Sequence, residues 1–264
     1  MSQFKFGLDA FEESNGSGGS NKPQSEFAKL PSGTALKVKL TGLDNVMRYY
    51  GYGIYKRVNT FIAANPSVRN ERGFVDSKHT PWDLAAKYYY DKASKAVENG
   101  ASDEEVKAIR NEAYKYNGKK RYAIGFIDLE TGKQIVLDFT GKQFDDVLKS
   151  ALVKYDAKKD KIAFELEKTG SGTNTKIMLT PIIDMDDDLT DKEKASFEKS
   201  IGKEFDKALF EGLLFEADEK TQTENLVAAG FDITLIGLSI GVNTDGNDSD
   251  FASGNEVKDE DYNF

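Results

Sequence analysis

Alternation of apolar and polar residues predicts that the body of this chain is built largely from β-strands. From Leu36 to Leu40 every second residue is apolar, and Lys37 and Lys39 occupy the positions between them. A period of two is typical of a half-buried strand, so we expect one over Thr34–Leu40 with a basic outer face. The segment Val46–Ala63 is rich in tyrosine and β-branched residues and contains two closely spaced glycines. It predicts one long strand, bent or bulged midway.

The remaining apolar stretches predict two hairpins and several helices. The hairpins join Tyr122–Leu129 to Gln134–Phe139 through a Thr-Gly turn, and Lys161–Thr169 to Thr175–Ile182. Helices are expected over Pro81–Ala96, from Asp103 behind a Ser-x-x-Glu capping box, over Gly141–Lys154, and from the capping box at Thr190 to about Ala217. The segment Asn65–Asp76 resembles a loop, whereas Leu226–Val242 fits either a strand or a packed helical hook.

Strands interrupted by one helical insertion favour a mainly β fold over a doubly wound sheet, in which strands and helices alternate regularly. We therefore expect an OB-fold, a five-stranded partly open barrel with helical insertions. Three segments are predicted: a flexible acidic segment and linker (1–28), a core (29–243) and a disordered acidic tail (244–264). The core contains an inserted helical subdomain at about 65–118 and ends in a C-terminal helical extension.

Composition narrows the possible chemistry. The chain of 264 residues has no cysteine, which excludes disulfides and thiol nucleophiles, and its single histidine, His79, removes most histidine-based catalytic and metal sites. We expect a protein that is not an enzyme and needs no metal or cofactor. No signal peptide or membrane-spanning run is recognisable, so the chain is expected in the cytoplasm, away from membranes.

The net charge of −9 is unevenly distributed along the chain. Between Lys29 and Ile182 there are 27 Lys and Arg against 19 Asp and Glu, whereas the rest of the chain has 9 basic and 26 acidic residues. A basic centre beside acidic flanks predicts a surface that binds a polyanion, with a tethered tail able to compete for it. Acidic flanks that only aid solubility are the alternative.

Three clusters interleave tyrosine with basic residues, which is the chemistry that holds single strands by base stacking and phosphate contacts. The nucleic-acid-binding candidates, including the two lysines of the first strand, are Lys37, Lys39, Arg48, Tyr49, Tyr50, Tyr52, Tyr55, Lys56, Arg57, Phe61, Lys87, Tyr89, Lys119, Lys120, Arg121 and Tyr122. Tyrosine is also common in the cores of sheets. The pattern therefore leaves open which of these rings face outward.

The acidic tail ends in an aromatic residue beside a carboxylate, a combination suited to an apolar pocket with a basic rim on a partner protein. The partner-binding candidates are Asp259, Glu260, Asp261, Tyr262 and Phe264. An inert acidic tail is the alternative.

In this arrangement the chain resembles the replicative single-stranded-DNA-binding proteins of tailed phages, helix-destabilising proteins with an OB-fold core. The resemblance covers roughly Lys29–Asp184: a first strand, a long aromatic strand, an inserted subdomain, the basic entry at Arg121 and Tyr122 into a hairpin, and a final pair of strands. The tail ending in Phe264 resembles both this family and bacterial single-strand-binding proteins.

The resemblance implies binding of single-stranded DNA without strong sequence preference during phage DNA replication, recombination and repair. It implies the cytoplasm of a bacterial host, and a tail that recruits a polymerase, helicase or primase. Some members hold a structural zinc in the inserted subdomain through cysteines and a histidine. Because this chain lacks cysteine, zinc is not expected.

Two other classes of function compete with this one. A metal-dependent nuclease would use the contiguous carboxylates of Asp184, Asp186, Asp187 and Asp188 to hold magnesium, although such a run before a helix is also simply a solvated linker. A protein-binding adaptor would bury the tyrosine clusters and act through its tail.

Overall fold

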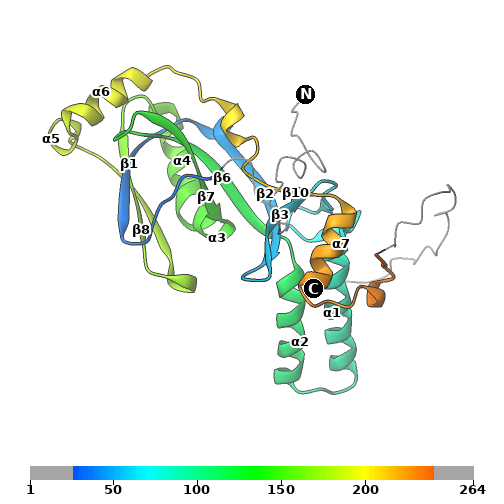
Figure 1. Ribbon diagram of the computed structural model, residues 1–264. Coiled ribbons are helices and arrows are strands. Elements are labelled where there is room, and N and C mark those ends of the chain that lie inside the picture. Colours follow the sequence, from blue (N-terminus) through cyan, green and yellow to red (C-terminus); the bar gives the residue numbers. More distant parts are fainter. Residues whose placement is uncertain (1–25, 241–264) are drawn as a thin grey trace, which may run out of the picture.

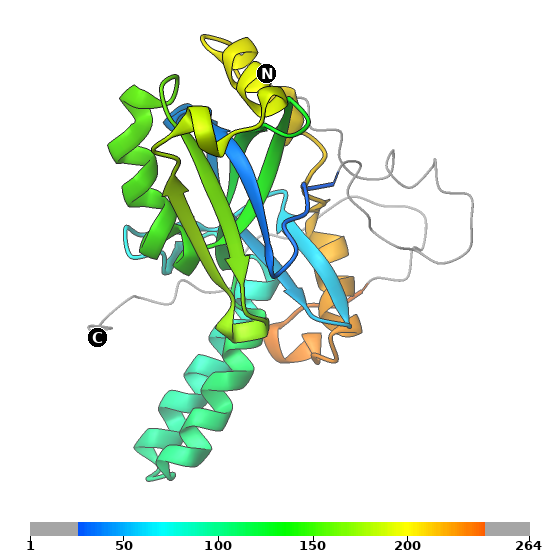
Figure 2. The same cartoon turned by 90° about the vertical axis from the view of Figure 1, so that its left-hand side faces the viewer.

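The computed structural model describes residues 26–240 and shows a twisted, sheet-rich body from which a helical hairpin projects (Figures 1 and 2). The expectation of a mainly β protein with helical parts is confirmed. The described strands form an open sheet rather than a closed barrel. The terminal ranges 1–25 and 241–264, which contain the predicted tail, lie outside the described residues.

Eight strands form the main sheet in the order β10-β3-β2-β6-β1-β8-β9, with β7 also paired to β6. Their bounds are β1 (Thr34–Leu40), β2 (Val46–Ile54), β3 (Val58–Ala63), β6 (Lys119–Asp128), β7 (Lys133–Thr140), β8 (Ala163–Thr169), β9 (Lys176–Pro181) and β10 (Glu216–Ala217). The β3–β10 pair is parallel and the other pairs are antiparallel. A separate two-stranded sheet joins β4 (Val68–Arg69) to β5 (Val75–Ser77).

Strand β6 is the centre of the main sheet because it pairs with three other strands. One edge pairs with β7 over residues 121–128. The other edge pairs with β2 over residues 119–124 and with β1 over residues 126–128. The sheet therefore divides at β6 into one wing of β2, β3 and β10 and another of β1, β8 and β9.

Helices cover the sheet and form the projecting hairpin. Their bounds are α1 (Pro81–Glu98), α2 (Asp103–Tyr116), α3 (Gly141–Gln143), α4 (Lys149–Tyr155), α5 (Met185–Asp188), α6 (Asp191–Ser200) and α7 (Glu219–Ala228), and a π-helical turn, η3 (Phe144–Leu148), joins α3 to α4. The predicted capping box of Ser102 and Glu105 starts α2, as expected. The continuous helix from α3 to α4 matches the helix predicted over Gly141–Lys154.

Two main apolar cores hold these layers together. Phe144, Leu148 and Leu152 pack from the α3–α4 helix onto residues of the sheet such as Phe126. The base of the α1–α2 hairpin, around Trp82, packs on β2, β3 and α7. The chain joins the body slightly earlier than predicted, because Ala28 N–H donates to the carbonyl of Val136 in β7 at 2.9 Å.

The prediction of one long strand over Val46–Ala63 is wrong. The chain turns back between β2 and β3, where Lys56 has φ 63° and the Arg57 N–H donates to the Ile54 carbonyl at 2.9 Å. The expected bulge is present, since the β2–β3 register shifts between Tyr52 and Ile54. The predicted loop Asn65–Asp76 contains β4 and the first residues of β5.

The helix predicted from Thr190 to Ala217 is also wrong beyond Ser200. Ile201 adopts an extended conformation with φ −62° and ψ 130°, which ends the helix, and Gly202 follows with φ 67°. Phe205 then packs over Gly125 of β6, where an added Cβ would lie 2.7 Å from the ring. Over the described part of Leu226–Val242 the helical alternative holds, because α7 is followed by a 3₁₀ turn at Ile233–Ile236. None of the described helices is long and apolar enough to cross a membrane.

Glu216 of β10 makes the stability of the body depend on pH. Burial raises the pKa of its carboxyl to about 7, so the folded state favours the protonated form. The contribution of this carboxyl to the free energy of unfolding is fully present below its pKa in the unfolded chain, and it is lost as the pH rises to about 7.

We expect Glu216→Gln to stabilise the protein at pH 8 by about 1 kcal/mol, or about 2–4 °C in Tm, and to have no effect near pH 4.5. Thermal unfolding at both pH values checks this, with the exposed Glu224→Gln as a control expected to change neither Tm. A pH-independent gain would contradict it.

Candidate nucleic-acid interface

Four of the predicted binding residues lie on one face of two neighbouring strands. In the antiparallel β2–β6 pair Tyr50 lies opposite Lys120, and Arg48 lies opposite Tyr122. Directly opposed residues point to the same face, and residues two apart along a strand share that face. The pairing therefore places two tyrosines and two cations on one face, where each tyrosine lies opposite one cation and beside the other along its own strand. We call these four residues the β2–β6 face.

The Tyr122 ring is held on one side by the helix that covers the sheet. It stacks on Phe144 of η3 with ring centroids 3.7 Å apart and planes inclined by 13°. The Lys120 Nζ lies 5.9 Å from the Tyr122 centroid and 2.7 Å from a carboxylate oxygen of Asp145. The hydrogen bond to Asp145 raises the pKa of Lys120, so this lysine stays charged.

Tyr50 is bordered by the β4–β5 hairpin. The Arg69 guanidinium carbon lies 4.2 Å from the centroid of the Tyr50 ring, a cation–π contact. Gly73 of the same hairpin lies close to the hydroxyl of Tyr50, because a Cβ added to Gly73 would be 3.0 Å from that oxygen. The small hairpin therefore contacts Tyr50 at both the ring and the hydroxyl.

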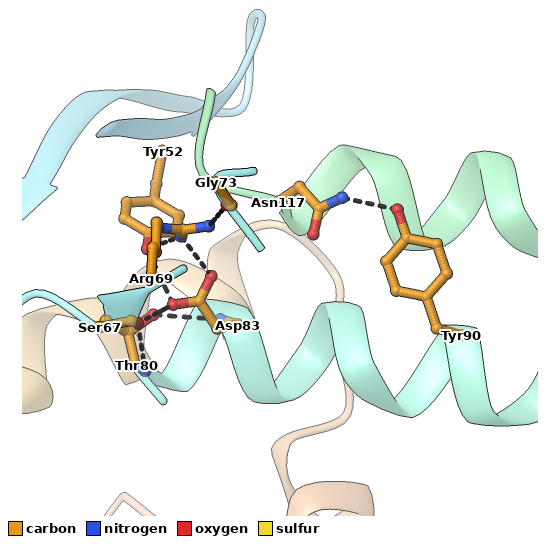
Figure 3. A network of polar contacts seen from close by, with 8 residues as sticks. All are labelled: Tyr52, Ser67, Arg69, Gly73, Thr80, Asp83, Tyr90 and Asn117. Atoms are coloured by element: carbon orange, nitrogen blue, oxygen red, sulfur yellow. Dashed lines mark hydrogen bonds and ion pairs between the residues drawn. The ribbon is translucent and has the colours of Figure 1, made fainter. Parts of the chain in front are cut away.

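Arg69 is held by a buried carboxylate at the start of α1 (Figure 3). Its Nη2 donates to Asp83 Oδ1 and to the Tyr52 hydroxyl, both at 3.0 Å, and its Nη1 donates to the Gly73 carbonyl at 3.1 Å. Asp83 is 3% exposed. It also accepts hydrogen bonds from the hydroxyls of Tyr52, Ser67 and Thr80. This network joins β2, the β4–β5 hairpin and α1.

A basic groove lies beside the β2–β6 face, between the end of α2 and the start of α3. Its lining includes four cations, Lys119, Lys120, Arg121 and Lys142, against two carboxylates, Asp145 and Asp146. The Lys119 Nζ lies 3.0 Å from the centroid of the exposed Tyr114 ring and donates to the Tyr114 carbonyl. Burial lowers the pKa of Lys119 to about 8, so this amine titrates close to physiological pH.

Three aromatic candidates are buried and offer no surface for stacking. Tyr49 points to the opposite side of the sheet from Tyr50 and donates to Asp138 at 2.8 Å. Tyr52 and Phe61 are 3% and 1% exposed and stack on each other in the core that surrounds Trp82. The expectation that these rings bind bases is corrected. Alternation along β2 turns Tyr49 to the opposite face, whereas Tyr52 and its cross-strand neighbour Phe61 are covered by the core around Trp82.

The expected basic outer face of β1 is also corrected. Lys39 is 2% exposed, and its Nζ lies 2.7 Å from Asp160 and 3.1 Å from the Ser200 carbonyl. Lys37 pairs with Glu193 of α6 at 3.1 Å. These lysines fasten the α6 region to the sheet, because segments distant in sequence supply their partners.

The other candidates lie apart from the β2–β6 face. Tyr55, 86% exposed, and Lys56 lie at the β2–β3 turn, and the Arg57 guanidinium donates to the Ala229 carbonyl. On α1, Lys87 pairs with Asp91, and the half-buried Tyr89 stacks on Tyr116. Arg121 points to the Tyr49 side, where it pairs with Asp138, although it also lines the groove. The five tail candidates lie outside the described residues.

Sequence analysis missed several residues that border this surface. They are Arg69 of the β4–β5 hairpin, Tyr114 of α2 and Lys142 of α3. The hairpin had a local signal, because Asn70 to Gly73 supply turn chemistry between Arg69 and Phe74. Asn70 forms that turn by accepting from the N–H groups of Arg72 and Phe74.

One of the four carboxylates suggested for a nuclease, Asp184, has a structural role at the start of a helix. Asp184 caps α5 by accepting from the N–H groups of Asp186 and Asp187, both at 3.2 Å. Within residues 26–240 no group of three or more His, Cys, Asp or Glu side chains is placed to hold a metal ion.

Comparisons with known proteins leave this surface as the main guide to function. No protein-family model matches the chain, and neither the curated proteins nor the solved structures gave a significant match.

The Asp83 network predicts a large cost of removing its carboxylate. We expect Asp83→Ala to destabilise the protein by about 3–5 kcal/mol, because Arg69 is then left buried without its counter-charge. Urea unfolding followed by the fluorescence of Trp82, the single tryptophan and fully buried, measures this. The control Asp91→Ala breaks an exposed pair with Lys87 and should cost less than about 1 kcal/mol. Equal losses for the two variants would contradict the assignment.

Proposed function

We propose that this chain binds single-stranded DNA without strong sequence preference on the β2–β6 face. One observation carries the proposal: both cross-strand pairs oppose a tyrosine to a cation, Tyr50 to Lys120 and Tyr122 to Arg48. Tyrosine rings stack on any base and cations contact any phosphate, so this face supplies both components of sequence-tolerant binding.

The stacking surfaces favour single strands over duplexes. In a duplex each base is already stacked between its neighbours, so a ring fixed on a sheet surface has no base face to contact. Tyr122 is fixed by Phe144, and Tyr50 by the β4–β5 hairpin. The basic groove with Lys119 and Lys142 continues the positive surface beyond the rings, which supports a path for the phosphates.

The wider role follows from the resemblance in arrangement and from the charge pattern. The proposed protein is a non-enzymatic, OB-fold-related binding protein of phage replication, recombination and repair in the cytoplasm of a bacterial host. It protects exposed strands and removes their secondary structure. Its acidic segment, residues 244–264, recruits a polymerase, helicase or primase, because aromatic residues among several carboxylates suit a pocket with a basic rim.

Titration of a fluorescent oligo-dT at two salt concentrations tests the β2–β6 face. We expect Tyr50→Ala and Tyr122→Ala each to weaken binding by about 1–3 kcal/mol, because each removes a stacking surface. Lys120→Met should reduce the slope of log K against log salt by about 0.7. The control Lys192→Met removes an exposed lysine of α6 and should leave the slope nearly unchanged. Failure of the unmodified chain to bind at low salt would contradict the proposal and favour the protein-binding adaptor.

The pKa of Lys119 predicts a pH dependence of binding. A phosphate near Nζ favours the charged amine, so binding takes up a proton when the free lysine is partly neutral. We therefore expect affinity for oligo-dT to fall between pH 7 and 9 as Lys119 deprotonates, by about tenfold at pH 9 if the bound amine stays charged. Lys119→Met should bind more weakly at pH 7 and lose most of this dependence. The same pH dependence in both proteins would assign it to another group.

A further inference from the structure

The rings of Tyr50 and Tyr122 are supported in different ways. Tyr122 rests on Phe144, which belongs to the apolar core beneath the α3–α4 helix. Tyr50 rests on the Arg69 guanidinium, which comes from a separate two-stranded sheet in the insertion. The orientation of Tyr50 therefore depends on how firmly Arg69 is held.

Arg69 is placed as a support rather than as a phosphate ligand. Its side chain is only 12% exposed, against 38% for Lys120. Its two terminal nitrogens already donate to Asp83, to the Tyr52 hydroxyl and to the Gly73 carbonyl. A guanidinium fixed by hydrogen bonds on its edge leaves its flat face for stacking, and that face meets Tyr50.

The Arg69 guanidinium covers one side of the Tyr50 ring, and the side chain of Tyr50 remains partly exposed. An aromatic side chain that is already ordered loses less freedom when its ligand binds, so preorganisation raises affinity without adding a contact. Asp83, at the start of α1, sets the position of Arg69 through a charged hydrogen bond at 3.0 Å. The insertion thereby reaches the sheet surface through a chain of Asp83, Arg69 and Tyr50.

We propose that Arg69 and Asp83 are positioning residues for nucleic acid, which hold the Tyr50 ring ready to stack on a base. This inference rests on the proposed function and assigns part of that function to the helical insertion. Neither residue needs to touch the strand. Their contribution to affinity exists only while Tyr50 is present.

A double-mutant cycle measures that dependence. Oligo-dT affinity is determined for the unmodified chain, Arg69→Met, Tyr50→Leu and the double variant. We expect Arg69→Met to weaken binding about threefold to tenfold when Tyr50 is present, and less than twofold when it is replaced. The control Arg72→Met removes an exposed arginine of the same hairpin and should have the same effect in both backgrounds, because its charge acts independently of the ring.

A second variant separates positioning from folding. Arg69→Lys keeps a positive charge beside Asp83 and removes the planar group beneath Tyr50. It should retain the Trp82 fluorescence of the folded insertion, leave the salt slope unchanged, and lose affinity only when Tyr50 is present. Equal fold-losses in the two backgrounds for both Arg69 variants would overturn the inference while leaving the proposed function intact. Absence of binding by the unmodified chain would overturn both.

Discussion

The pairing of β6 along both of its edges is the constraint on which the rest of the structure depends. One edge pairs with β7 over residues 121–128, whereas the other is divided between β2 and β1. Because β2 occupies residues 119–124, its register with β6 decides which side chains share a face. A slip of one residue would move Tyr50 and Arg48 to the side now filled by Tyr49 and Phe205. The same pairing that builds the sheet therefore builds the proposed binding face.

The insertion adds a second constraint, because it brings a buried charge to the edge of that face. Thr80 caps α1 by accepting from the Asp83 N–H, and its hydroxyl donates to the Asp83 carboxylate, which also neutralises Arg69. A buried carboxylate is tolerated only when its hydrogen bonds and counter-charge are complete. The Tyr52 hydroxyl of β2 is one of the groups that donate to Asp83. Burial, and to a smaller extent the nearby charge of Asp83, raises the pKa of Tyr52 to about 12. The phenol therefore stays protonated and able to donate. The insertion and the sheet are thus fixed relative to each other by polar contacts as well as by the Trp82 core.

Local patterns predicted the elements better than the contacts between them. Capping boxes identified the starts of α2 and α6, and period-two alternation identified β1, because these signals depend on neighbours in sequence. The β2–β3 turn was missed because Lys56 adopts a left-handed conformation without a glycine. The sequence named both tyrosines of the proposed binding face, Tyr50 and Tyr122, but it also named the buried rings of Tyr52 and Phe61. Only the register with β6 and the packing of Trp82 separate the exposed rings from the buried ones, and neither is visible in one strand alone.

The cations near this face differ in how firmly the protein holds them, and this difference separates their roles. The pair of Lys120 and Asp145 is well exposed, so its attraction is weak and a phosphate can replace the carboxylate. The pair of Arg121 and Asp138 is more buried, and that of Arg69 and Asp83 is almost fully enclosed. If either arginine turned to a phosphate, Asp83 or Asp138 would lose its counter-charge. The free-energy cost of that loss grows with the burial of the carboxylate. In the proposed function the phosphate contacts therefore fall to Arg48, Lys119 and Lys120. The number of counterions released on binding should then be smaller than the number of basic residues that the sequence places in this region.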